Sequence, residues 1–219
     1  MHKPNLEHEY DAIVIGGGIA GTAIVKSLKN NGINNFLLID EGVSPATGTS
    51  NHFAALCHPY IGRGASRLQR LTHLAFDEAR LVWANNWCQG GVFHLAKKGV
   101  SFNKGKLSEH LLSLGFNNDN AIALSEDESK PIIGIQAAGT WFPSGGWVNL
   151  KKSCEEELNQ LLPRQVMWQT KLTKIDRDGK LWVVFDQDKN PLAKAKRIFL
   201  AASLGTKGLA ETAGIHLPL

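Results

Sequence analysis

The stretch Ala12-Ile13-Val14-Ile15-Gly16-Gly17-Gly18-Ile19-Ala20-Gly21 decides the fold of this chain. Its first four residues form a short apolar run, which is typical of a buried parallel strand. The glycines follow at once in the pattern Gly-x-Gly-x-x-Gly, and a helical pattern continues to about residue 30. A strand, a glycine turn and a helix in this order predict the start of a dinucleotide-binding unit.

Each glycine of the pattern has a separate structural reason. Gly16 permits the tight turn out of the strand, Gly18 lets the backbone approach a pyrophosphate, and Gly21 lets the helix pack close to the sheet. The first helical residues, Ile19 and Ala20, lie where free N–H groups and a positive dipole end favour phosphates. We therefore expect these five residues to hold the pyrophosphate of a dinucleotide.

An acidic residue follows the second predicted strand. The apolar run Phe36-Leu37-Leu38-Ile39 ends in Asp40, which lies 19 residues beyond Gly21. A carboxylate at this place can accept two hydrogen bonds from a ribose diol. The alternative is a glycine-rich turn with an incidental surface aspartate, which the strand, the helix and the spacing make the weaker interpretation. The pattern alone does not separate FAD from NAD.

The composition indicates a globular protein with a mildly basic surface. The 219 residues are 43% hydrophobic and 20% charged, with a net charge of +4 and a pI near 9.0. A nucleotide or an RNA would suit this charge, although an ordinary solvated surface is the simpler explanation. Cys57, Cys88 and Cys154 form no zinc or disulfide motif, so we expect no metal, reduced thiols and a cytoplasmic location. No apolar stretch approaches the ~20 residues of a membrane span, and no signal peptide is expected.

The rest of the pattern predicts two domains, one inserted into the other. Helices are predicted over residues 66–88 and 149–162, and strands over residues 165–170, 181–185 and 197–201. The Asp178-Gly179 turn predicts that the first two of these strands form a hairpin. Ser125 and Glu128 have the spacing of a capping box. We expect a dinucleotide-binding domain over residues 1–89 and 148–219, interrupted by a second domain over residues 90–147.

Further segments resemble the amino-acid-oxidase type of flavoprotein. Asp40-Glu41-Gly42 is followed by Thr47-Gly48-Thr49-Ser50-Asn51 and Ala54-Ala55-Leu56, similar to the small-residue loop after the second strand in that family. The resemblance implies an α/β fold, with a Rossmann-like FAD-binding domain of the glutathione-reductase type and an interrupted, incomplete α+β substrate domain. It implies that Glu41, Thr49, Ser50 and Ala54 bind FAD, the last three on its flavin side.

Two later positions join the cofactor site by the same resemblance. Leu172 falls in the strand whose backbone contacts adenine in the family. Ala202 belongs to the stretch Arg197-Ile198-Phe199-Leu200-Ala201-Ala202-Ser203-Leu204-Gly205, which is similar to a second strand of Ala-Thr-Gly type. This chain departs from the family there, because Ala202-Ser203-Leu204 stands where Thr-Gly is usual.

Three segments narrow the resemblance to the oxidoreductase domain of the MnmC family, which modifies the wobble uridine of bacterial tRNA. They are Asn51-His52-Phe53-Ala54-Ala55-Leu56-Cys57-His58-Pro59, Trp87-Cys88-Gln89-Gly90-Gly91-Val92 and Phe142-Pro143-Ser144-Gly145-Gly146-Trp147. The resemblance implies that FAD takes a hydride from the carbon beside the amine of carboxymethylaminomethyl-uridine. Hydrolysis of the resulting imine would leave aminomethyl-uridine and glyoxylate, and reoxidation by oxygen would give peroxide.

The family's oxidoreductase unit is longer than this chain. The resemblance therefore implies its N-terminal half, without the methyltransferase domain often fused upstream, and a missing C-terminal half or partner chain. Two other functions remain open: an oxidase of a small amine such as a D-amino acid, glycine or sarcosine, and an inactive FAD-binding remnant. No catalytic side chain is assigned.

Several polar and aromatic residues have both a functional and an ordinary interpretation. His52 and His58 flank the presumed flavin loop, where a histidine could orient substrate, but ordinary loop histidines are the preferred interpretation. Arg63, Arg67 and Arg70 share a helix face and could contact a phosphate, although a solvated face is preferred. Trp147 is expected to be a packing residue, with a place in the substrate cavity as the alternative.

Overall fold

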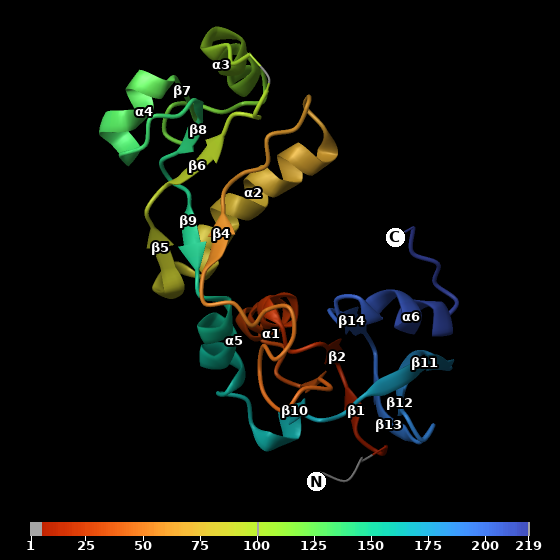
Figure 1. Ribbon diagram of the computed structural model, residues 1–219. Coiled ribbons are helices and arrows are strands. Elements are labelled where there is room, and N and C mark those ends of the chain that lie inside the picture. The colour runs from red at the N-terminus through yellow and green to blue at the C-terminus, as the bar shows by residue number, and fades with distance from the viewer. Residues whose placement is uncertain (1–5, 100, 219) are drawn as a thin grey trace. The chain divides into compact units, whose positions relative to one another are not determined.

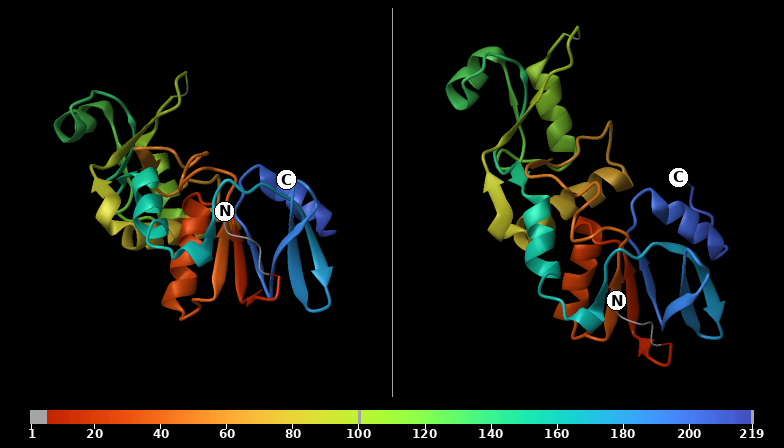
Figure 2. Two further views of the ribbon diagram at one scale, coloured as in Figure 1. Left: turned by 90° about the horizontal axis from the view of Figure 1, so that it is seen from below. Right: turned by 60° about the horizontal axis from the view of Figure 1, so that its bottom comes forward.

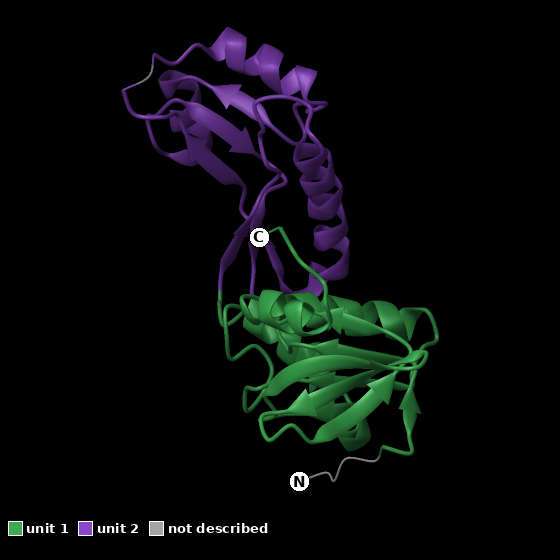
Figure 3. Ribbon diagram, turned by 90° about the vertical axis from the view of Figure 1, so that its right-hand side faces the viewer, with its two compact units in different colours: residues 1–53, 150–219 green, residues 54–149 purple. Residues whose placement is uncertain are grey.

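The computed structural model describes residues 6–99 and 101–218 of the chain (Figure 1). The chain forms two compact units, coloured separately in Figure 3. The first comprises Met1–Phe53 and Leu150–Leu219, and the second comprises Ala54–Asn149. The polypeptide therefore leaves the first unit once and returns to it once.

The first unit is built on a parallel sheet with the strand order β10-β3-β2-β14. These strands are Val166–Met167, Phe36–Ile39, Ala12–Ile15 and Ile198–Leu200. All three neighbouring pairs are parallel. The strand β14, from near the C-terminus, pairs with β2 from near the N-terminus (Figure 2). Every residue of β2 and β3 is buried, as the apolar runs predict for strands covered on both faces.

The two faces of this sheet are covered by different layers. On one face, Val14 and Leu38 pack with residues of helices α1 (Ile19–Asn30) and α5 (Leu150–Leu158). On the other face, Ile13 and Ile39 pack with residues of a second sheet and of helix α6 (Gly205–Thr212). The unit therefore has three layers, and the predicted α/β fold is confirmed.

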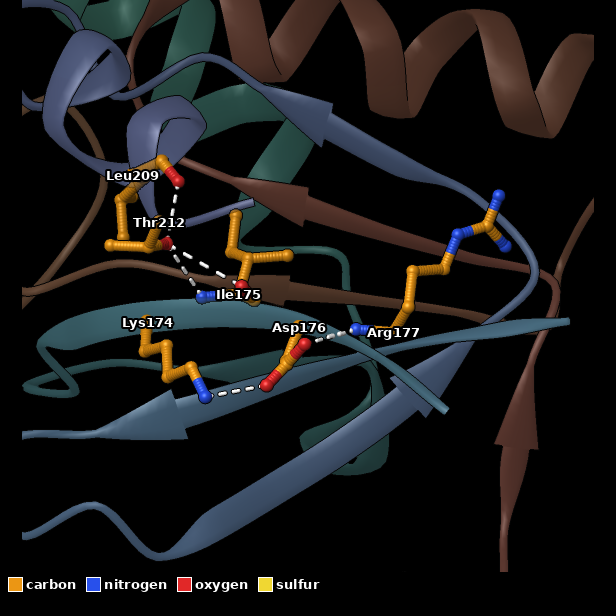
Figure 4. A network of polar contacts seen from close by, with 6 residues as sticks. All are labelled: Lys174, Ile175, Asp176, Arg177, Leu209 and Thr212. Atoms are coloured by element: carbon orange, nitrogen blue, oxygen red, sulfur yellow. Dashed lines mark hydrogen bonds and ion pairs between the residues drawn. The ribbon is translucent and has the colours of Figure 1, made fainter. Parts of the chain in front are cut away.

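The second sheet of this unit has the strand order β1-β13-β12-β11. Its strands are Glu9–Tyr10, Pro191–Ala195, Leu181–Asp186 and Leu172–Asp178. The edge strand β11 is tied to α6, because the Ile175 N–H donates to Thr212 Oγ1 at 2.9 Å (Figure 4). The same hydroxyl donates to the Leu209 carbonyl at 2.7 Å. The Thr212 side chain of α6 thus gives one N–H group on the open edge of the sheet a hydrogen-bond acceptor.

One predicted hairpin is wrong in its first strand. The partner of β12 across the Asp178-Gly179 turn is β11, and the segment predicted as that partner, residues 165–170, contributes β10 to the parallel sheet instead. The hydrophobic pattern of the sequence did not predict β11, because exposed charged side chains interrupt its apolar positions and its pairing shifts between Leu172 and Lys174. Two apolar positions, Leu172 and Ile175, are all that the strand buries.

The second unit contains two three-stranded antiparallel sheets. One has the order β4-β9-β5 and the other β6-β8-β7. The strands are β4 (Ala55–Cys57), β9 (Gly146–Val148), β5 (Trp87–Gln89), β6 (Val92–Leu95), β8 (Gly139–Phe142) and β7 (Ile122–Leu124). The helices are α2 (Arg67–Val82), α3 (Lys104–Ser113) and α4 (Glu126–Ile133). The short 3-10 helices are Ala84–Asn86 in this unit and Pro163–Gln165 in the first.

The observed units do not share both boundaries with the predicted domains. The return near residue 148 lies within two residues of the observed one, but the first change of unit comes at residue 54, not near residue 90. Helix α2 packs within the second unit: Gln69 donates to the Leu114 carbonyl at 3.1 Å, and His73 stacks on Phe116. The helix predicted to reach residue 88 ends at Val82, because the residues from Trp87 on pair with β9.

None of the helices in the described part of the chain combines the length and the apolar character needed to cross a membrane.

Candidate cofactor site

The first unit contains a cavity of about 760 Å³ beside the carboxyl ends of its parallel strands. Its lining comes from the ends of β2, β3 and β14 and from the segments that follow them. In open α/β sheets, ligands bind outside the carboxyl ends of the strands. The cavity is therefore where the fold places a ligand site, and its lining comprises residues 15–20, 39–41, 46–50, 170–172, 200–206 and Leu209.

The glycine turn leaves no room for side chains. Gly16 has a φ of +116°, and a Cβ atom there would lie 2.3 Å from the Ala201 carbonyl oxygen. At Gly21 the Cβ would lie 1.8 Å from the Gly16 carbonyl oxygen, and at Gly18 it would lie 2.8 Å from Ser50 Oγ. Gly16 and Gly21 thus fix the packing of strand and helix, while Gly18 keeps backbone at the cavity.

The N-terminus of α1 opens into this cavity. Gly18 is the N-cap and supplies no capping side chain, and the Thr22 N–H donates to the Gly18 carbonyl at 2.9 Å. The earlier N–H groups of the first turn have no partner inside the helix. One of them, that of Ile19, donates to Ser50 Oγ at 2.9 Å. A helix start of this kind favours an anionic group.

Asp40 links the end of β3 to the glycine turn. Its Oδ2 accepts from the Gly17 N–H at 2.6 Å, and its Oδ1 accepts from the Gly42 N–H at 2.7 Å. A carboxylate offers about four lone-pair sites, so further acceptor capacity remains toward the cavity. Glu41, the next residue, is exposed and also lines the cavity.

The loop of small residues after β3 folds back over the glycine turn. The Ala46 N–H donates to the Gly17 carbonyl at 3.0 Å, and Ala46 is buried with a φ of +56°. Ser50 is buried, whereas Thr47 and Thr49 are exposed at the cavity. This loop therefore forms a wall of the cavity and positions Ser50 against the helix start.

The segment after β14 forms another part of the cavity wall. Ala202 and Ser203 precede α6, and Ser203 has a φ of +51° although it is not a glycine. Leu204 is 93% exposed at the cavity. A serine in the left-handed region is strained, and Ser203 belongs to the segment Ala202-Ser203-Leu204 that stands where the resemblance leads us to expect Thr-Gly.

The structure brings most of the predicted cofactor residues to one cavity. All of them line it except Gly21, which packs under the turn, and Ala54, which begins the second unit. Sequence reasoning did not include Gly17, Thr47, Thr170, Lys171 and Ser203, which line it as well. Each lies within two residues of a predicted site position, so the motifs located the segments without giving their full extent.

The three cysteines are free thiols. Burial raises the pKa of the Cys57 thiol and of the Cys154 thiol, which favours their protonated forms. None of the three lines the cavity.

Comparison with known proteins agrees with this geometry. Residues 11–219 match the family described as FAD dependent oxidoreductase, DAO. The chain belongs to this family. The DAO family is FAD-dependent, and the site residues described above fit FAD, because side-chain-free backbone faces the cavity at Gly18 and a carboxylate with spare acceptor capacity follows β3.

Curated relatives in this family carry a function in tRNA modification. The chain is 28% identical over 204 residues to the tRNA 5-methylaminomethyl-2-thiouridine biosynthesis bifunctional protein MnmC of Thiobacillus denitrificans, with 90% of this chain and 32% of that protein covered. It is 30% identical over 220 residues to MnmC of Ralstonia nicotianae, with 95% and 33% covered. The chain spans about a third of the length of these relatives.

Solved structures of DAO-type enzymes share the fold. Glycine oxidase from Geobacillus kaustophilus has a TM-score of 0.73 at 17% identity, covering 94% of this chain and 59% of that one. L-α-glycerophosphate oxidase from Mycoplasma pneumoniae, with FAD bound, has a TM-score of 0.72 at 19% identity, covering 94% and 57%. At such identities the likeness concerns the fold alone.

Proposed function

We propose that this chain is part of an FAD-dependent amine oxidoreductase that acts on the carboxymethylaminomethyl group of a tRNA wobble uridine. The observation that carries the proposal is the cavity formed by the glycine turn, Asp40 and the loop at residues 46–50. Similarity to two MnmC proteins over nine-tenths or more of the chain supports the choice of substrate.

We assign different residues to different parts of FAD, beginning with the pyrophosphate. Gly16, Gly18 and the start of α1, at Ile19 and Ala20, hold the pyrophosphate, because the first N–H groups of α1 have no partner within the helix and its positive end favours an anion. Gly21 supports this turn from below.

The roles of the remaining cofactor residues follow from the acidic position after β3 and from the family resemblance, and all of these residues except Ala54 line the cavity. Asp40 accepts hydrogen bonds from the ribose hydroxyls, and Glu41 lies beside it. Thr49 and Ser50 lie on the flavin side, and Leu172 offers its backbone to adenine. Ala202 belongs to the wall after β14, and Ala54 follows the loop of residues 46–50 along the chain.

The chemistry needs a two-electron acceptor, which FAD supplies when bound. The chain's own residues bind and orient the cofactor. Ser50 does so indirectly, because its hydroxyl accepts from Ile19 N–H and fixes the loop against the helix start. No residue of the described chain is assigned as an acid or a base, and a neutral amine can lose a hydride without one.

The first experiment is the visible absorption spectrum of the purified chain before and after addition of FAD and desalting. We expect bound flavin at about one per chain, with bands at roughly 375 and 450 nm. Gly18→Val is expected to abolish this binding, because its side chain projects toward Ser50 and the pyrophosphate position. Gly208→Ala is the matched control, since a Cβ at Gly208 meets nothing within 4 Å.

Turnover then tests the substrate. The FAD-loaded chain is incubated with tRNA containing carboxymethylaminomethyl-uridine, and in parallel with glycine, sarcosine and D-alanine. Loss of the carboxymethyl group from the tRNA nucleoside supports the proposal. If peroxide forms only with a free amino acid, the proposed substrate would be a small amine and not tRNA. If the Gly18→Val variant binds FAD as tightly as the parent, the proposed cofactor site is refuted.

A further inference from the structure

Helix α2 packs on the second unit with one side and leaves its other side open. Gln69 and Phe76 lie on the packed side and are 1% and 6% exposed. Residues three or four positions apart are neighbours on a helix surface, so leucines at such spacings form a continuous strip and not scattered single contacts. The strip on the open side contains Leu68, Leu71, Leu74 and Leu81, which are 57%, 64%, 71% and 76% exposed.

The open side has the residue spacing of a helix that pairs with another helix. Intervals of four, three, four and three residues separate Arg67, Leu71, Leu74, Glu78 and Leu81, and all five are exposed. This spacing is that of the contact line between two paired helices. We call these five residues the seam of α2. It combines leucines with one cation and one anion.

The two charges of the seam lie symmetrically about its central leucines. Arg67 comes four residues before Leu71, and Glu78 comes four residues after Leu74. A second copy of α2 laid antiparallel on the first, with the two-fold axis midway between the two leucines, brings Leu71 opposite Leu74 of the other copy. The same axis brings Arg67 opposite Glu78 of the other copy. A two-fold interface requires this self-complementarity, because the same patch meets itself.

The residues beside the seam follow the same symmetry. In an antiparallel pair, Arg70 on one flank faces Asp77 of the other copy, and Leu68 on the other flank faces Ala75 of the other copy. One flank thus matches opposite charges and the other matches apolar groups. In the described part of the chain no ion pair engages the four charged residues of this side, which are exposed: Arg67, Arg70, Asp77 and Glu78.

We propose that the open side of α2 binds the same side of a second copy of this chain in antiparallel orientation. The central leucines supply the apolar contact, and the pairs of Arg67 with Glu78 at both ends set the orientation. A parallel pair would instead place each of these charges opposite its own kind, which costs free energy. The inference goes beyond the proposed function, since it requires neither FAD nor RNA.

The size of the contact predicts a weak dimer. The 16 residues of α2 form a helix roughly 24 Å long, and a single pair of such helices makes a smaller interface than those of most stable complexes. We expect a dissociation constant on the order of 10⁻⁵ M. The leucines of α2 are therefore open in dilute solution and covered in concentrated solution.

The test measures self-association of the full chain by sedimentation, at concentrations from well below to well above the expected dissociation constant. Glu78→Arg places arginine opposite arginine in both pairs and should weaken association at least about tenfold. Arg67→Glu should do the same by placing glutamate opposite glutamate. The double variant with both changes exchanges the charges and should associate like the parent.

A mixture of the two single variants gives the sharpest result. One copy then carries glutamate at both positions and the other carries arginine at both, so each charge again has its opposite. The mixture should form dimers with the affinity of the parent, although neither variant associates with itself. Glu109→Arg makes the same charge change as Glu78→Arg at an exposed position of α3 and should leave association unchanged. Circular dichroism confirms that each variant is folded.

The outcomes separate this inference from the proposed function. A parent that stays monomeric over the whole range overturns the dimer, as it would if a different polypeptide covered α2, and leaves FAD binding untouched. Association that survives both single variants, or that the mixture fails to recover, overturns the antiparallel contact. A chain that forms the dimer and recovers it in the mixture but cannot retain FAD supports the inference and refutes the proposed function.

Discussion

The two units of this protein differ in how completely they bury their apolar side chains. In the first unit, Val14, Phe36 and Leu38 are fully buried between a parallel sheet and helices. In the second unit, large apolar side chains remain open on the helices and on small sheets. They are Leu56, Leu68, Leu71, Leu74, Leu81, Leu95, Leu112, Ile132 and Trp147.

Sheet architecture explains this difference. Parallel strands joined by helices are covered on both faces, so their side chains have partners whichever way they point. Three-stranded antiparallel sheets such as β4-β9-β5 can pack on one face and leave the other open. The first unit thus buries its core beside the cavity at the carboxyl ends of its strands, whereas the second unit leaves more apolar surface exposed.

The largest expected effect on the free energy of unfolding comes from replacing a leucine by alanine, and the two units should respond differently. Leu38→Ala removes a side chain that is 0% exposed from the first unit, and should lower the free energy of unfolding by about 3 kcal/mol. Leu74→Ala removes a side chain that is 71% exposed on α2, and should change it by less than about 0.5 kcal/mol. Urea unfolding followed by circular dichroism measures both.

An equal loss in the two variants would contradict the comparison. It would mean that the leucines of α2 are covered in solution by polypeptide that packs on this helix. Sedimentation at several concentrations would then show whether a second copy of the chain covers them.

A smaller effect is expected where the first unit closes the edge of its second sheet. Thr212→Val removes the hydroxyl that accepts from the Ile175 N–H and donates to the Leu209 carbonyl (Figure 4). Leaving this partly buried N–H without an acceptor should cost about 1 kcal/mol. Thr212→Ser keeps the hydroxyl and should restore most of that loss in the same urea measurement. Equal stability of the valine variant and the parent would show that α6 does not hold this edge.

Much of the first unit could be predicted because its signals are local. The strand at Ala12–Ile15, the glycine turn and the acid at Asp40 lie within 30 residues, and each has a steric or hydrogen-bonding reason. The cavity walls at Thr47 and Ser203 needed tertiary structure. These two residues line the same cavity as the glycine turn only after β3 and β14 pair with β2.

The second unit was less predictable because its strands are short. Trp87–Gln89 has three residues and follows a helix without a glycine or proline stop, so the helical pattern concealed it. Pairing with β9, almost 60 residues later, is what makes it a strand. In contrast, the capping box at Ser125 and Glu128 is a local signal and is confirmed by the structure.

The smallest expected effect concerns that capping box, which is partly buried and stabilises the second unit through polar contacts. The hydrogen bond from Lys104, followed by those from Ser125, lowers the pKa of Glu128 from its usual 4.5 to about 2. The folded state therefore binds fewer protons than the unfolded state between these values. The stabilisation is complete above about pH 5 and is lost as the pH falls toward 2. The difference in melting temperature between the parent and Glu128→Gln should shrink over that interval, and a difference that stays constant with pH would show that Glu128 gains nothing from its charge.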